Sequence, residues 1–155
     1  MGTERTSSLN LLYPPFKMLL VTAIQDANRK GMYPMVFESW RSNERQAFLY
    51  AQGRTAPGEI VTNAAPGLSF HSVGLAVDLV FDANPATEKP EWSWSGDYFT
   101  LTKIMRGYGF ESLAMEKAHF QLSYGLTIKE IKQIADTSGV LGLWQELDKR
   151  LGGKK

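Results

Sequence analysis

The strand that is easiest to recognise in this sequence carries an acidic residue at its centre. Every second residue from 75 to 81 is large and apolar, which is the pattern of a strand that packs one face against a core. The opposite face carries Ala76, Asp78 and Val80. An unpaired polar group in a core costs about 2–7 kcal/mol, and an ionised carboxylate costs more. Asp78 therefore requires a partner, which could be an arginine, a set of backbone donors or a metal ion.

Two histidines occur in the chain, and both can approach Asp78. His71 precedes a glycine at which the chain can turn sharply into the strand. His119 lies in a second strand-like run, where it shares a face with Gln121. A lone histidine is more often a core or surface residue than a ligand, so the prediction depends on all three side chains. Two imidazoles and one carboxylate suit Zn²⁺, with a fourth position left for a water whose pKa falls to about 7.

Hydrolysis at such a site also needs a group that accepts a proton from water. Glu116 is suited to that role because it lies three residues before His119. The same Glu-x-x-His pattern occurs in di-iron bundles, but those require two copies and further glutamates. This chain has one copy, and it lacks the His-Glu-x-x-His motif of other zinc peptidases.

Composition excludes several other classes of protein. A chain of 155 residues suits a single domain with a hydrophobic core. Seventeen basic and 16 acidic residues give a net charge of +1, which argues against nucleic-acid binding as the main task. The absence of cysteine excludes disulfides, thiolate ligands and cysteine nucleophiles. No apolar run reaches the ~20 residues of a membrane span, and no signal peptide is recognisable. We expect a monomer without membrane or nucleic-acid partners.

Short strands and helices follow one another without a regular βαβ order, which predicts an α+β fold. The second helix is expected to be capped by Asn43, with Gln46 reaching back to it. The predicted elements are helices over residues 14–30, 43–53 and 98–108, strands over 33–38, 75–81 and 118–122, and a loop over 54–68.

Residues 125–151 are predicted to form a pair of helices. Thr127 and Glu130 make a capping box for the first helix, which we expect to end near Ala135. The second places Val140, Trp144 and further apolar residues on one face. The pair could bind a partner, but packing onto the core of a single domain, residues 1–155, is the favoured interpretation.

Two segments resemble a known family. Residues 69–78 match the Ser-x-His-x-x-Gly-x-Ala-x-Asp signature of D-Ala-D-Ala carboxypeptidases and dipeptidases of the vancomycin-resistance type. The same signature occurs in the L-alanyl-D-glutamate peptidases of bacteriophage endolysins. Residues 116–121 resemble the second signature, an acidic residue followed by x-Pro-His-Phe, with Ala118 in place of the proline. Residues 40–64 are closer to the L-alanyl-D-glutamate group.

The resemblance implies a small antiparallel sheet flanked by helices, as in D,D-peptidases and hedgehog-like zinc domains. Arg41 is expected to bind a substrate carboxylate or a developing oxyanion, although a surface salt bridge is an alternative. The implied roles are zinc ligation by His71, Asp78 and His119, catalysis by Glu116 and Arg41, and substrate contact by Ser69 and Gln46.

The activity that the resemblance implies is zinc-dependent hydrolysis of the stem peptide of bacterial peptidoglycan. We expect cleavage of the L-Ala-D-Glu bond by a phage endolysin, made in the host cytoplasm and acting on the wall after release. The alternatives are a D-alanyl-D-alanine carboxypeptidase or dipeptidase, and a non-catalytic zinc-containing binding domain. Residues 109–115 lack the Trp-Gly-Gly of the endolysin group, which leaves the specificity open. Trp92 and Trp94 could line a substrate groove, but core packing is favoured.

Overall fold

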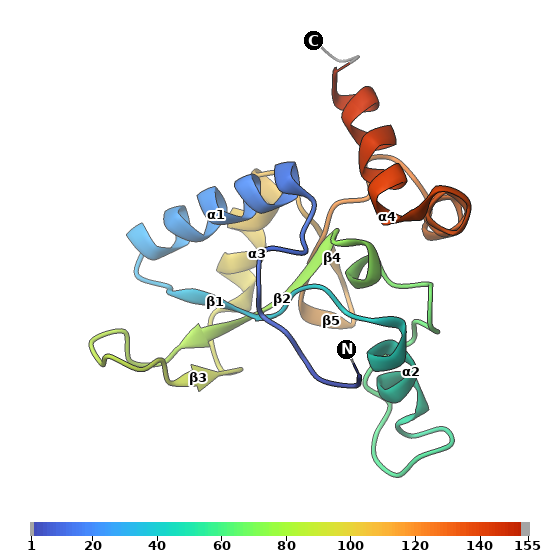
Figure 1. Ribbon diagram of the computed structural model, residues 1–155. Helices are drawn as coiled ribbons and strands as arrows, with labels where there is room; N and C mark the ends of the chain where they lie inside the picture. The colour runs from blue at the N-terminus through green and yellow to red at the C-terminus, as the bar shows by residue number, and fades with distance from the viewer. Residues whose placement is uncertain (1, 153–155) are drawn as a thin grey trace.

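Strand β2 (Ala76–Asp82) lies at the centre of a five-stranded antiparallel sheet (Figure 1). The structure is a computed structural model and describes residues 2–152. The strand order is β1-β2-β5-β4, and β3 pairs with β2 outside this path. The other strands are β1 (Pro34–Glu38), β3 (Trp92–Ser93), β4 (Glu111–Leu113) and β5 (Glu116–Gln121). The helices are α1 (Pro14–Arg29), α2 (Asn43–Ala51), α3 (Tyr98–Gly107) and α4 (Ile128–Gly152), with a 3₁₀ turn η1 (Phe70–Val73). This is the predicted α+β class.

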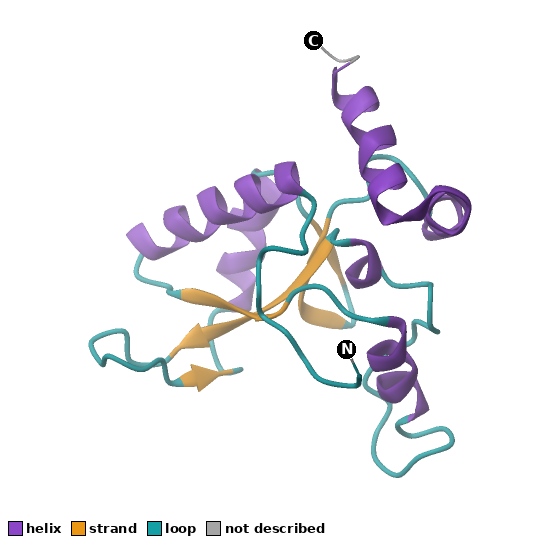
Figure 2. Cartoon of the chain, viewed as in Figure 1, coloured by secondary structure: helices purple, strands orange, loops and turns teal. Residues whose placement is uncertain are grey.

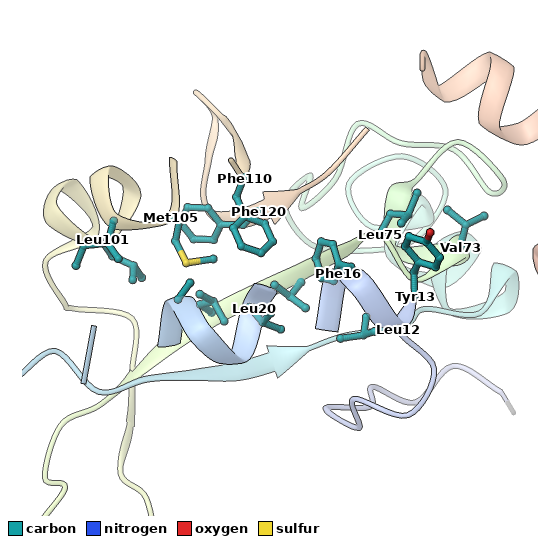
Figure 3. Close-up of a cluster of buried hydrophobic side chains, with 14 of the residues drawn as sticks. Leu12, Tyr13, Phe16, Leu20, Val73, Leu75, Leu101, Met105, Phe110 and Phe120 are labelled. Carbon is teal, nitrogen blue, oxygen red and sulfur yellow. The ribbon is translucent and has the colours of Figure 1, made fainter. Parts of the chain in front are cut away.

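One face of the sheet packs against α1 and α3. The alternating residues Leu75, Val77 and Leu79 are completely buried there. Figure 3 shows side chains of α1 and α3 meeting the aromatic rings of this core. The rings of Phe16 and Phe110 meet edge to face, with centroids 5.3 Å apart. Because α1 and α3 cover this face, Asp78 and its neighbours on the opposite face of β2 remain available for a functional site.

Several boundaries differ from the predictions. The cap of α2 is Ser42 and not Asn43, because the Ser42 hydroxyl accepts a hydrogen bond from the backbone N–H of Arg45 at 3.0 Å. Strand β5 begins two residues before the predicted position because it forms a tight hairpin with β4, which was not predicted. Nor were η1 and β3. Trp92 and Trp94 are 43% and 47% exposed, so the prediction that both pack in the core was wrong.

The turn from η1 into β2 requires glycine. Gly74 has φ +76°, and a Cβ at this position would come within 2.6 Å of the Leu11 carbonyl oxygen and 2.9 Å of the Trp144 ring. Only glycine combines a left-handed conformation with so close an approach. The turn matters for the site because η1 carries His71.

Helix α4 is two helices joined at Gly139, where the backbone is not helical (Figure 2). The predicted capping box is present: the Thr127 N–H donates to Glu130 at 3.0 Å, and the Glu130 N–H donates to the Thr127 hydroxyl at 3.1 Å. In the second half, Leu143 and Leu147 are fully buried in the same hydrophobic cluster as the sheet. Although α4 spans 25 residues, no helix within residues 2–152 has the length and apolar character needed to cross a bilayer.

Candidate metal centre

His71, Asp78 and His119 converge at one point on the open face of the sheet. Their ligand atoms all lie within 4.8 Å of one another. His71 comes from η1, whereas Asp78 and His119 are direct partners in the register of β2 and β5. The Oδ1 atom of Asp78 lies 3.3 Å from Nε2 of His71 and 3.5 Å from Nδ1 of His119. The structure thus brings together all three of the predicted metal ligands.

Hydrogen bonds to the outer nitrogens set the tautomers of both imidazoles. Nδ1 of His71 lies 2.8 Å from the carbonyl oxygen of Ser39, which can only accept, so Nδ1 carries the proton. Nε2 of His119 lies 2.7 Å from Oε1 of Gln121, which fixes the proton of that ring on Nε2. The remaining nitrogens, Nε2 of His71 and Nδ1 of His119, therefore present lone pairs toward Asp78. This arrangement of outer partners is the one found around metal-bound histidines.

The electrostatics of the cluster favour an ionised Asp78. Burial by itself opposes ionisation, but the charges and hydrogen bonds of the two imidazoles, when these rings are protonated, hold the pKa of its carboxyl well below the usual range. Burial lowers the pKa of His119, whereas the hydrogen bond and the charge of Asp78 raise it, and the net direction is upward. A carboxylate that stays charged in these surroundings is available as a metal ligand at neutral pH.

These residues fit a zinc ion. Nε2 of His71 is buried and forms no hydrogen bond with the residues that the structure describes, although it faces the site. A buried lone pair without a hydrogen-bond donor is costly, and coordination of a metal removes that cost. Two imidazole nitrogens and one carboxylate oxygen match the three protein ligands of catalytic zinc sites. Within residues 2–152, this is the one group of three or more such side chains close enough to hold an ion.

Arg41 holds the second oxygen of Asp78. Its Nη2 donates to Asp78 Oδ2 at 3.2 Å and to Glu38 Oε1 at 2.8 Å. Glu38 also accepts from Arg45 Nε at 2.6 Å. Burial raises the pKa of Glu38, but the hydrogen bonds and charges of Arg45 and Arg41 outweigh it, so the pKa is lowered. This buried ion network fixes the orientation of Asp78.

The alternative interpretation of Arg41, a surface salt bridge, is wrong because the residue is only 8% exposed. Its Nε forms no hydrogen bond within the described part of the chain, and Arg41 lines the cavity beside the metal ligands. Contact with a substrate stays a prediction.

Gln46 and Ser69 lie close to the site in different ways. Gln46 is fully buried behind Arg41: its Oε1 accepts from Arg41 Nη1 at 2.9 Å, and its Nε2 donates to the Ala64 carbonyl at 2.7 Å. Ser69 caps η1, because its hydroxyl accepts from the His71 N–H at 3.2 Å, and it also lines the cavity. Both residues position the site, and direct contact of either with a substrate remains a prediction.

A small cavity of about 100 Å³ lies beside the metal ligands. Glu116, the first residue of β5, is half-buried and lines it together with His119. This position is compatible with the predicted proton acceptor, whose role stays a prediction. The cavity is lined by Arg41, Thr62, Ala64, Leu68, Ser69, Phe70, His71, Leu113, Glu116, His119 and Gln121.

Sequence reasoning missed the partners that orient the ligands. Gln121 had a detectable signal, since it shares a strand face with His119. Glu38 stands at the end of a predicted strand, but nothing local indicates that it pairs with Arg41. Ser39 acts through its backbone carbonyl, for which no side-chain signal exists.

Comparisons with known proteins agree with this geometry. The family model VanY, D-alanyl-D-alanine carboxypeptidase, matches residues 12–135. The chain is 34% identical over 91 residues to the peptidoglycan L-alanyl-D-glutamate endopeptidase CwlK of Bacillus subtilis (strain 168). That alignment covers 55% of this chain and 54% of CwlK, so the chain spans about half the length of this curated relative.

Three solved structures share the fold. VanYB in complex with D-alanine-D-alanine has a TM-score of 0.53 and 18% identity, covering 100% of this chain and 91% of that one. An L,D-carboxypeptidase DacB from Streptococcus pneumonia has a TM-score of 0.51 and 23% identity, covering 85% and 80%. A vancomycin-resistance D,D-pentapeptidase VanY has a TM-score of 0.50 and 19% identity, covering 92% and 89%. This VanY structure contains Zn(II), which agrees with the predicted cofactor.

Proposed function

This chain belongs to the VanY family of D-alanyl-D-alanine carboxypeptidases, and from that premise we propose that it hydrolyses the stem peptide of peptidoglycan between L-Ala and D-Glu. The main support for peptidase activity is that two imidazole lone pairs and the Asp78 carboxylate converge beside a cavity lined by Glu116. A purely structural metal site would not need a carboxylate such as Glu116 beside an open cavity.

The roles of the side chains follow from their positions. A zinc ion held by His71, Asp78 and His119 would supply a Lewis acid and lower the pKa of bound water to about 7. Glu116 accepts a proton from the attacking water and returns it to the leaving amine. The Nε of Arg41, which has no hydrogen-bond partner within residues 2–152, donates to the substrate carbonyl as negative charge develops on its oxygen. The hydrogen bonds that Ser39 and Gln121 accept from the imidazoles, and the one that Arg41 donates to Asp78, hold the three ligands in place throughout.

Two observations support the L-Ala-D-Glu bond as the target. The relative CwlK is named a peptidoglycan L-alanyl-D-glutamate endopeptidase and is 34% identical over the 91 matched residues. Residues 40–64 also resemble the L-alanyl-D-glutamate group of peptidases. The rival target is the terminal D-Ala-D-Ala bond, which the description of the family model favours.

We propose in addition that the protein acts as a phage endolysin, a monomer made in the host cytoplasm and released to the wall. The support is the resemblance of residues 40–64 to the L-alanyl-D-glutamate peptidases found in endolysins. Expression in a bacterial host should cause lysis only when a membrane pore is opened, and sedimentation should give the mass of one chain. Lysis without a pore, or none with one, contradicts the endolysin role.

Digestion of purified peptidoglycan tests which bond of the stem peptide the protein cleaves. The zinc-loaded protein should release fragments with a new N-terminal D-glutamate, identified by mass spectrometry, and no free alanine. Asp78→Ala is the inactive control, because it removes a metal ligand. Free D-alanine as the main product would assign the chain to the carboxypeptidase branch instead.

A further inference from the structure

A groove lies beside the β4–β5 hairpin and shares one lining residue with the metal-site cavity. Its volume is about 390 Å³, and its lining includes Tyr98 and Phe99 of α3 and Leu113 of β4. Leu113 lines the metal-site cavity as well, so the two spaces adjoin at this hairpin residue. A substrate that leaves the metal site over this residue enters the groove.

Basic side chains line the groove. Lys103, Arg106 and Lys117 line it, all three are exposed, and no acidic residue is part of the lining. None of the three takes part in a salt bridge within residues 2–152. Asp97, whose pKa Lys103 helps to lower, and the chain neighbours Glu111 and Glu116 lie outside this lining.

Aromatic and hydroxyl groups hold these cations in position. The Lys103 ammonium lies 4.3 Å from the centre of the Phe99 ring, and the Lys117 ammonium lies 5.0 Å from the centre of the Tyr98 ring. The Arg106 Nε donates to the Ser112 hydroxyl at 3.0 Å. These contacts are attractive but leave the charges available to an anion.

The direction of the substrate follows from Glu116. This residue returns a proton to the leaving amine, so the amine side of the scissile bond lies next to it. Lys117, the next residue of β5, lines the groove. Glu116 lines the metal-site cavity, which adjoins the groove at Leu113, so the part of the substrate on the amine side reaches these cations where it passes over Leu113. In an L-Ala-D-Glu bond the amine belongs to glutamate, which keeps one carboxylate free whichever carboxyl continues the chain.

We propose that this groove, where Lys103, Arg106 and Lys117 adjoin the metal site across Leu113, binds the carboxylates on the amine side of the scissile bond. The inference rests on the proposed function, because it takes the position of the amine from Glu116. It names a specificity determinant: the groove selects stem peptides with a free glutamyl carboxylate over their amidated forms.

Binding of two matched peptides to zinc-loaded Glu116→Gln protein tests the proposal without turnover. One is acetyl-L-Ala-D-Glu-L-Lys, joined through the γ-carboxyl so that the α-carboxylate is free, and the other carries an amide there. Calorimetry should give tighter binding of the acid, with at most about a fivefold contribution from each exposed cation. The ratio of the two affinities should fall toward one in the Lys103→Gln, Arg106→Gln, Lys117→Gln triple variant and at high salt.

Controls separate this result from general charge effects. Lys129→Gln makes the same change outside the groove and should keep the preference for the acid. Lys117→Arg keeps the charge and should therefore also keep the preference for the acid. Equal binding of acid and amide by the parent, or an undiminished preference in the triple variant, overturns the groove assignment. Failure of the parent to cleave the L-Ala-D-Glu bond at all is a separate result, which overturns the proposed function.

Discussion

The Nε2 atom of His119 lies 2.7 Å from the side-chain oxygen of Gln121, two residues further along the same strand. Because β-strand side chains alternate between faces, residues two apart lie on the same side of the sheet. Gln121 thereby holds the imidazole proton on the outer nitrogen and turns the lone pair of Nδ1 toward Asp78.

Replacement of Gln121 by methionine should weaken zinc binding. The thioether has a similar length but accepts hydrogen bonds poorly, so His119 loses its orienting partner while packing is kept. Loss of such a partner typically costs about 10–100-fold in metal affinity. Competition with a chromophoric chelator measures the change. Gln133→Met on the exposed surface of α4 is the matched control and should bind zinc as the parent does.

Zinc should raise the thermal stability of the protein. An ion that binds the folded chain and not the unfolded one stabilises it by about 2.7 kcal/mol at a free concentration of 100 Kd. Removal of the metal with a chelator should therefore lower the midpoint of unfolding, and zinc should restore it. In Asp78→Ala the midpoint should not respond to zinc. A response equal to that of the parent would mean that the ion binds elsewhere.

Replacement of Glu116 by glutamine should abolish most hydrolysis without loss of zinc. The amide keeps the shape of the side chain but cannot accept a proton at neutral pH, and proton transfer typically contributes roughly 10²–10⁴-fold to rate. Measurement of kcat/KM, zinc content and the unfolding midpoint separates catalysis from structure. The exposed Glu88→Gln is the charge-matched control. If both variants keep the activity of the parent, Glu116 is not the proton acceptor.

The second half of α4 should contribute strongly to the stability of the whole domain. Leu147 is completely buried, so Leu147→Ala should cost about 2–5 kcal/mol in the free energy of unfolding. Leu141 lies on the same half-helix but is 69% exposed, and Leu141→Ala should cost less than about 0.5 kcal/mol. Denaturant titration measures both. Equal small effects would mean that this helix pair is not part of the core.

Much of the fold was predictable because its signals are local. The period-two pattern of residues 75–81 identified the central strand, and the capping box of Thr127 and Glu130 identified the start of α4. The short strand β3 was missed, because a two-residue strand carries no periodicity and forms only when β2 is beside it. Trp92 and Trp94 were misjudged for a related reason, since hydrophobicity alone does not tell whether a covering element exists.

The sequence by itself determined which residues could bind a metal. Two histidines and one aspartate in an apolar strand leave few other ways to satisfy a buried charge. Only the tertiary structure decided how those ligands are oriented. His71 takes its tautomer from a backbone carbonyl 32 residues earlier in the chain, and Asp78 takes its orientation from Arg41. The tertiary structure also decided the composition of the groove, whose cations come from α3 and β5. Contacts of this kind depend on distances between elements, and packing of the core against the sheet sets those distances.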